Sequence, residues 1–180
     1  MTLSSPPAFI GHACVVGSRE GDGPLRDSFD LISEDTTFGA DSWERAESNM
    51  VKKCLALALN KADLAPQDVD YIFAGDLLNQ CTGSSFGLRE SEIPFFGLYG
   101  ACSTMAESLA LAALVIDGGF ADRAAAVTSS HFCSAERQFR FPLEYGGQRP
   151  PTAQWTVTGS GAEILASEVH GPYITHVTAG

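Results

Sequence analysis

The sequence predicts an α/β fold: a mixed, mostly parallel five-stranded sheet with helices on both faces. Short apolar segments that are typical of strands alternate with longer segments of helical character, an order that favours a parallel sheet covered on both sides. The clearest helix follows Cys102, where residues 105–116 are apolar apart from Glu107 and Ser108. Because Ala and Leu favour helix and no polar face is present, we expect this helix to be buried all round.

The N-terminal part of the chain contains one strand, one loop and one long helix. Residues 9–17 are mostly apolar and end at a glycine, which predicts the first strand. Residues 18–37 are polar and rich in turn-forming residues, so we expect a long loop. A helix is predicted over residues 42–61, with Asp or Ser at positions 41–42 as its N-cap. Glu47 is assigned to the first turns, where the helix dipole favours an acidic side chain.

The rest of the chain supplies the remaining strands. Four more are predicted, at residues 69–75, 93–99, 123–130 and 156–166. A short helix is expected at residues 84–90, and residues 172–177 could add a last strand. Residues 131–154 contain many Arg, aromatic, Gly and Pro residues without a clear period, so we expect an ordered loop.

Composition limits the classes of function. The net charge is -11 and the sequence pI is about 4.6, which argues against binding nucleic acid or an anionic membrane surface. The five cysteines are an odd number and include no Cys-x-x-Cys pair, so we expect reduced thiols and no structural zinc site. The N-terminus lacks a signal-peptide pattern and no apolar run is long enough to span a bilayer, so we expect an intracellular protein.

Three residues with chemical potential each follow a predicted strand. Ligands collect at the carboxyl ends of strands in such sheets, so Asp76, Cys102 and His131 are expected to meet at one edge. Cys102 would lie at the N-terminus of the apolar helix, where free N–H groups favour a thiolate and can bind an anion. The alternatives stay open at this point: free cysteines are often simply buried, and His131 could be a structural histidine.

Other candidate groups carry weaker signals. The spacing of His12 with Cys14 permits a metal ligand pair, but without a carboxylate partner we predict no metal site. The arginines at positions 137, 140 and 149 lie among aromatic residues. They could form a solvated face or a contact between chains, or the guanidinium group of one of them could bind a carboxylate through two parallel hydrogen bonds.

Several blocks of the sequence resemble a known family. The segment Gly-Ala-Cys-Ser at residues 100–103 is similar to the nucleophile turn of the thiolase superfamily. The more specific blocks resemble the stage V sporulation protein AD family, whose members consist of two similar halves. These blocks lie at residues 74–80, 96–107, 114–121, 128–131, 135–140 and 144–148. The resemblance implies that residues 1–180 are a thiolase-like N-terminal half domain, with the second half absent from this chain.

The resemblance also implies a non-catalytic role. The family binds dipicolinic acid, a flat aromatic dicarboxylate, and takes part in the uptake of calcium dipicolinate into the developing spore. It is expected to lie peripherally at the spore inner membrane, beside the other membrane proteins of the stage V sporulation A operon, and to form a homodimer through a sheet edge. No cofactor is expected.

A ligand site can be predicted from these considerations. The N–H groups of Ser103 and Thr104 would bind one carboxylate and Arg137 the other. Cys102 and His131 would border the pocket, and a structural role is predicted for Asp76. The alternative is an acyl-CoA or acyl carrier protein condensing enzyme with Cys102 as nucleophile. Such an enzyme takes its His and Asn from the second half, so a non-enzyme is expected.

Overall fold

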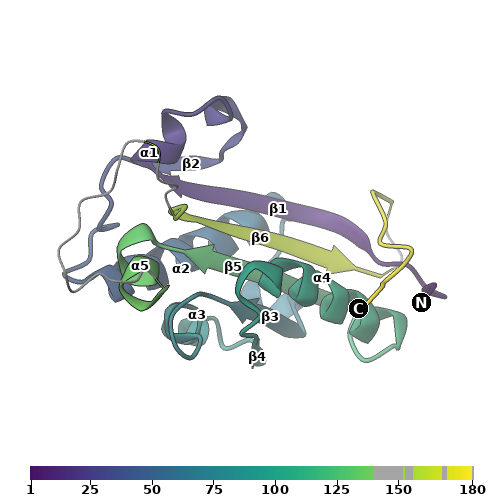
Figure 1. Ribbon diagram of the computed structural model, residues 1–180. Helices are drawn as coiled ribbons and strands as arrows, with labels where there is room; N and C mark the ends of the chain where they lie inside the picture. The colour runs from purple at the N-terminus through teal and green to yellow at the C-terminus, as the bar shows by residue number, and fades with distance from the viewer. Residues whose placement is uncertain (140–151, 153–155, 168–169, 180) are drawn as a thin grey trace.

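The computed structural model describes residues 1–139, 152, 156–167 and 170–179, with no side chains described from residue 136 to 139. These residues form one six-stranded sheet (Figure 1), in the order β2-β1-β6-β5-β3-β4. Its strands are β1 (Ala8–Gly17), β2 (Leu31–Ser33), β3 (Tyr71–Gly75), β4 (Phe95–Gly97), β5 (Arg123–Ser130) and β6 (Gly159–Ala166). Strand β6 is antiparallel to both of its neighbours, and the other three pairings are parallel.

The predicted α/β fold with a mixed sheet is therefore confirmed, with one strand more than expected. The extra strand is β2, which lies inside the segment predicted to be a loop. It has only three residues, and its backbone pairs in parallel with the end of β1. A strand this short is specified by its neighbour in the sheet and not by a pattern of its own.

Helices cover both faces of the sheet, as predicted. The longer ones are α2 (Trp43–Lys61) and α4 (Thr104–Asp117), which pack on opposite faces (Figure 1). The shorter ones are α1 (Ser18–Gly21), α3 (Thr82–Leu88) and α5 (Phe132–Phe139). None of the helices in the described ranges has the length and apolar character that crossing a bilayer requires.

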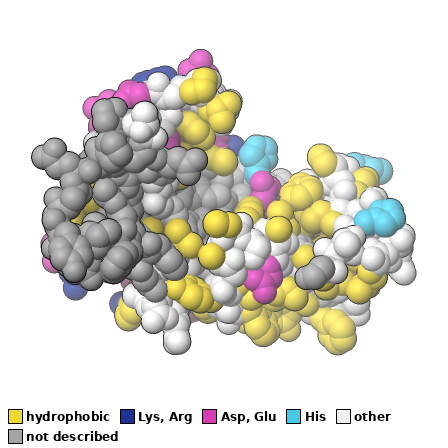
Figure 2. Space-filling view, in the orientation of Figure 1, with side chains coloured by type: hydrophobic (Ala, Val, Ile, Leu, Met, Phe, Trp, Pro, Cys, Tyr) yellow, Lys and Arg dark blue, Asp and Glu magenta, His cyan; other side chains and the backbone are white. Residues whose placement is uncertain are grey.

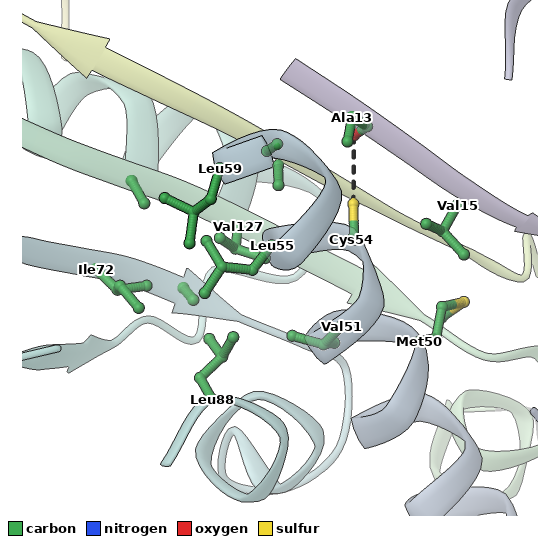
Figure 3. Packing of buried hydrophobic residues seen from close by; sticks show 14 of the residues in the cluster. Ala13, Val15, Met50, Val51, Cys54, Leu55, Leu59, Ile72, Leu88 and Val127 are labelled. Atoms are coloured by element: carbon green, nitrogen blue, oxygen red, sulfur yellow. Dashed lines mark hydrogen bonds between the residues drawn. The ribbon is translucent and has the colours of Figure 1, made fainter. Parts of the chain in front are cut away.

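The face of the sheet under α2 is fully packed. Ser42 caps this helix by accepting a hydrogen bond from the Arg45 N–H, as the sequence predicted. Figure 3 shows the α2 side chains directed onto the strands, with the Cys54 thiol 3.3 Å from the carbonyl oxygen of Ala13. Met50, Ile72 and Ile164 are each completely buried in this cluster. Burial raises the pKa of Cys54 to about 12, so this thiol is a packing group.

The face under α4 is only partly covered, which corrects the expectation of a helix buried all round. Ala112, Ala113 and Ile116 pack against the sheet, but Leu109 beside them and Leu114 on the other side of α4 are only half-buried. Hydrophobic side chains gather on this face of the molecule (Figure 2). Helix α4 is apolar, as the sequence predicted, but the sheet covers only one side of this helix.

Two further expectations need correction. The segment after β5 begins with helix α5 and not with an irregular loop; most of the predicted loop lies outside the described residues. Residues 172–177 form no strand, but they lie beside the N-terminal segment through two isolated bridges. These bridges pair Thr2 with His176 and Ala8 with Tyr173, so the two ends of the chain run together (Figure 1).

Candidate functional site

A hollow of about 270 Å³ lies beside Cys102 at the carboxyl ends of β3 and β5. We call it the Cys102 hollow. Its lining includes Gly75 at the end of β3, Thr104 and Met105 of α4, Thr128 of β5 and Gly161 of β6, besides Cys102 itself. The sequence predicted a site at this edge of the sheet, and the structure places a hollow there. A larger depression of about 920 Å³ lies between α2 and α3, away from all the predicted site residues.

Glycines shape the floor of the Cys102 hollow. A Cβ on Gly75 would lie 2.0 Å from the carbonyl oxygen of Leu98, so only glycine lets the chain leaving β4 pass the end of β3. This close approach positions the turn that carries Cys102. A Cβ on Gly161 would meet no atom within 4 Å, so the hollow stays open above β6.

Cys102 lies in a tight 3₁₀ turn, Ala101–Ser103, directly before α4. Ala101 has a φ of 49°, a left-handed conformation that is unfavourable for a residue with a side chain. The turn leaves the Cys102 thiol exposed. The predicted placement at the start of the helix is thus confirmed, and Cys102 is not a packing cysteine like Cys54.

The N–H groups of Ser103 and Thr104 are already engaged inside this turn. The Ser103 N–H donates to the Gly100 carbonyl at 3.0 Å, and the Thr104 N–H donates to the Ala101 carbonyl. The Ser103 hydroxyl also donates to the Gly100 carbonyl, at 2.7 Å. Thr104 lines the hollow, whereas Ser103 is exposed and lies outside its lining. The turn therefore uses the two donors that were predicted for a carboxylate.

His131 lies on the opposite face of the sheet from Cys102, which corrects the prediction that both border one pocket. Side chains alternate along β5, so Thr128 points to α4 while Ser129 points to α2. His131 also faces the α2 side, where its Nε2 lies 2.7 Å from the Thr36 carbonyl oxygen and its ring packs on Trp43. Burial lowers the pKa of His131, as for a structural histidine.

The arginine predicted to bind the ligand cannot be placed. The Arg137 side chain lies outside the described part of the chain, as do residues 140 and 149. Within the described ranges, no group of three or more His, Cys, Asp or Glu side chains is arranged to hold a metal ion.

Asp76 has the structural role that the sequence analysis preferred. It is almost fully buried, and its carboxylate accepts hydrogen bonds from three backbone N–H groups. The donors are Leu78 and Gly83, both at 3.1 Å, and Ser84 at 2.8 Å. These bonds hold the chain from β3 into α3 and so fix one wall of the hollow.

Glu47 lies near the start of α2, as the sequence predicted, but its burial was not predicted. It is completely buried, and its two carboxyl oxygens accept hydrogen bonds from Ser129 at 2.9 Å and Ser134 at 2.7 Å. Burial, together with the nearby charge of Asp76, raises the pKa of Glu47 to about 7. Its position could have been found: Glu47 stands three residues before Met50 and so shares the buried stripe of α2.

Comparison with known proteins identifies the family. The profile of the family described as stage V sporulation protein AD matches residues 1–180. The chain belongs to the stage V sporulation protein AD family. It is 45% identical over 175 residues to stage V sporulation protein AD of Bacillus subtilis (strain 168), covering 97% of this chain and 52% of that protein. The chain thus spans about half the length of this relative.

Solved structures confirm the thiolase-like fold of this member of the stage V sporulation protein AD family. One is 3-oxoacyl-[acyl-carrier-protein] synthase III from Aquifex aeolicus, with a TM-score of 0.58 and 16% identity, covering 89% of this chain and 53% of that chain. Another is a variant of OleA from Xanthomonas campestris, with a TM-score of 0.61 and 15% identity. The match covers 93% of this chain and 57% of that chain. At this identity the likeness concerns the fold alone.

Proposed function

We propose that the protein binds dipicolinate in the Cys102 hollow without catalysis, as a step in the uptake of calcium dipicolinate into the developing spore. Membership of a sporulation protein family supports the biological setting. The observation that carries the proposal is the small open hollow beside an exposed Cys102, at the sheet edge where α/β folds bind ligands.

The chemistry of the hollow suits a flat aromatic carboxylate. Met105 and Val157 provide apolar walls for a ring, and the glycine at position 161 leaves room above the strand. The Thr128 hydroxyl lies 3.6 Å from the Met105 sulfur, a weak acceptor that a carboxylate would readily replace. In this proposal Cys102 remains a ligand-binding residue, and Thr104 lines the site without donating to the ligand. Thr128 replaces His131, and Arg137 remains the proposed partner of the second carboxylate.

A non-catalytic role is proposed because, within the described residues, no histidine lines the hollow beside Cys102. The His131 ring is engaged on the other face of the sheet. A nucleophilic cysteine needs a base and oxyanion donors to transfer an acyl group. The second candidate is an acyl-CoA or acyl carrier protein condensing enzyme. The exposed Cys102 at a strained strand-to-helix turn favours that candidate.

The proposed setting is peripheral, at the spore inner membrane, with the membrane proteins of the stage V sporulation A operon as partners. Self-association into a homodimer through a sheet edge is part of the same proposal. Strand β4 is an outer strand of the sheet, and its residues Phe95 and Phe96 are exposed, which supports an interface at this edge.

Calorimetry with dipicolinate and the full-length protein tests the binding proposal. Gly161→Val places a side chain in open space within the hollow, so the fold is retained while affinity falls by about tenfold or more. Cys102→Ala is compared with Cys14→Ala, a half-buried free cysteine outside the hollow, which should bind normally. Unchanged affinity in Gly161→Val and Cys102→Ala would remove this hollow as the site.

Mass spectrometry separates the two candidate functions. The full-length protein is incubated with acyl-CoA, and Cys102 is examined for an acyl adduct. The binding proposal expects no adduct that turns over. A thioester on Cys102 with product release would establish the condensing enzyme instead.

A further inference from the structure

Two buried carboxyl groups lie directly behind the Cys102 hollow. Ser129 and Asp76 both line the hollow, and Ser129 donates a hydrogen bond of 2.9 Å to Oε1 of Glu47. A Cβ on Gly83 would lie 3.1 Å from the Cγ methylene of Glu47 and 3.2 Å from the carboxyl carbon of Asp76, so the two side chains are neighbours, and the charge of Asp76 acts on Glu47. Only one residue therefore separates Glu47 from the hollow.

Among the described residues, the charged groups that shift the pKa of Glu47 are both acidic. Besides Asp76, the charged residue that faces it is Glu44, one turn earlier on α2. From β5 and α5 it meets the Ser129 and Ser134 hydroxyls, and from α3 it meets Gly83. The nearest histidine, His131, is kept neutral at pH 7 by burial, which lowers its pKa.

The two carboxyl groups differ in their donors: three backbone N–H groups donate to Asp76. Glu47 accepts hydrogen bonds from two serine hydroxyls, and the Ser134 hydroxyl has a second acceptor in the His131 carbonyl oxygen. When Glu47 takes a proton, its O–H donates to one serine oxygen, and that serine hydroxyl turns to another acceptor. The Ser134 hydroxyl already lies 3.1 Å from the His131 carbonyl oxygen, so the rearrangement requires no movement of the backbone.

We propose that binding of a carboxylate ligand in the Cys102 hollow is coupled to uptake of one proton by Glu47. The inference rests on the proposed function of the hollow. An anion in the hollow repels the carboxylates behind it, and Glu47 relieves this repulsion by binding a proton from solvent. No other bond forms or breaks. The raised pKa of Glu47, about 7, lets this happen near neutrality.

The expected effect can be estimated from the separation of the charges. Two like charges about 10 Å apart, at an effective dielectric constant of about 20, shift a binding equilibrium by about tenfold. Dipicolinate should therefore bind about tenfold more tightly below the pKa of Glu47 than well above it, although the ligand itself is fully ionised over this range.

Calorimetry of the full-length protein in two buffers with different ionisation enthalpies counts the protons taken up when dipicolinate binds. The wild type should take up about half a proton near pH 7, the amount that a tenfold coupling allows, with affinity falling as pH rises. Glu47→Gln keeps a hydrogen-bonding side chain without the charge, so it should bind tightly at all pH values with no proton uptake. Glu34→Gln, the same change at an exposed carboxylate outside the hollow, should behave like the wild type.

The outcomes separate this inference from the proposed function. Binding without proton uptake, or with uptake that persists in Glu47→Gln, overturns the inference and leaves the function standing. Absence of any binding removes both. If Glu47→Gln fails to fold, an infrared difference spectrum of the wild type decides: dipicolinate must produce a protonated carboxyl band, and its absence contradicts the coupling.

Discussion

The two faces of the sheet differ in how completely they are covered. On the α2 face the large side chains of Met50, Ile72 and Ile164 are completely buried, and so are the ionisable Glu47 and His131. On the α4 face Cys102 is exposed and Leu109 is half-buried. Strand β5 contributes to both faces, because alternate residues of this strand complete a closed core on one side and line an open hollow on the other.

The glycines of the hollow should differ most in their tolerance of a side chain. Gly75→Ala should destabilise the fold by about 5 kcal/mol, because its Cβ would collide with the Leu98 carbonyl. Gly161→Ala should change stability by less than about 0.5 kcal/mol, because its Cβ meets open space. Urea unfolding of both variants checks this, and equal losses would show that the floor of the hollow is not open.

Core truncation should reveal the same contrast between the faces. Met50→Ala on the closed face should cost about 4 kcal/mol, since a fully buried side chain leaves a cavity. Leu109→Ala on the open face should cost about 1 kcal/mol, because the leucine is already partly in water. The unfolding free energies of the two variants are measured and compared with that of the wild type. A Leu109→Ala loss as large as that of Met50→Ala would mean that the α4 face is closed in solution.

The buried carboxyl of Glu47 should make stability depend on pH. Its pKa is raised from 4.5 to about 7 in the fold, so ionising it destabilises the folded state. The wild type therefore loses up to about 3 kcal/mol between pH 4.5 and pH 7, and this loss persists at higher pH. Glu47→Gln should be more stable than the wild type above pH 7, with the difference disappearing below pH 4.5. A variant that is equally destabilised at every pH would refute this reading.

The reactivity of the cysteine thiols should also differ between the two faces of the sheet. A water-soluble alkylating reagent should modify Cys102 in the folded protein, because the thiol is exposed. Cys54 should react only after unfolding, because it is fully buried and its pKa is raised to about 12. Peptide mapping after short and long labelling times provides the readout. Early modification of Cys54 would show that the closed face opens readily.

Much of the fold could be predicted from the sequence because local patterns carried it. Strand β5 was predicted with the bounds it has, and helix α2 with its Ser42 cap, since periodicity and capping are local signals. Strand β2 was missed because three residues carry no period, and its pairing partner lies elsewhere in the chain.

The candidate site was predicted less completely, since it depends on which way side chains point. The position of Cys102 followed from the strand-to-helix junction. The position of His131 did not, because one residue more or less after β5 reverses the face that a side chain occupies. Glu47 was assigned to the first turns of α2 because it is close to the helix start, but its spacing of three residues from Met50 places its side chain in the core.

The central claim is that dipicolinate occupies the Cys102 hollow, and protection of Cys102 tests it most directly. The alkylation rate of Cys102 is measured in the full-length protein with and without saturating dipicolinate, and Cys14 serves as the internal reference. We predict that dipicolinate slows modification of Cys102 by about tenfold or more, as occlusion of a small hollow requires, and leaves Cys14 unchanged. An unprotected Cys102 in protein that demonstrably binds dipicolinate would place the ligand elsewhere and contradict the account.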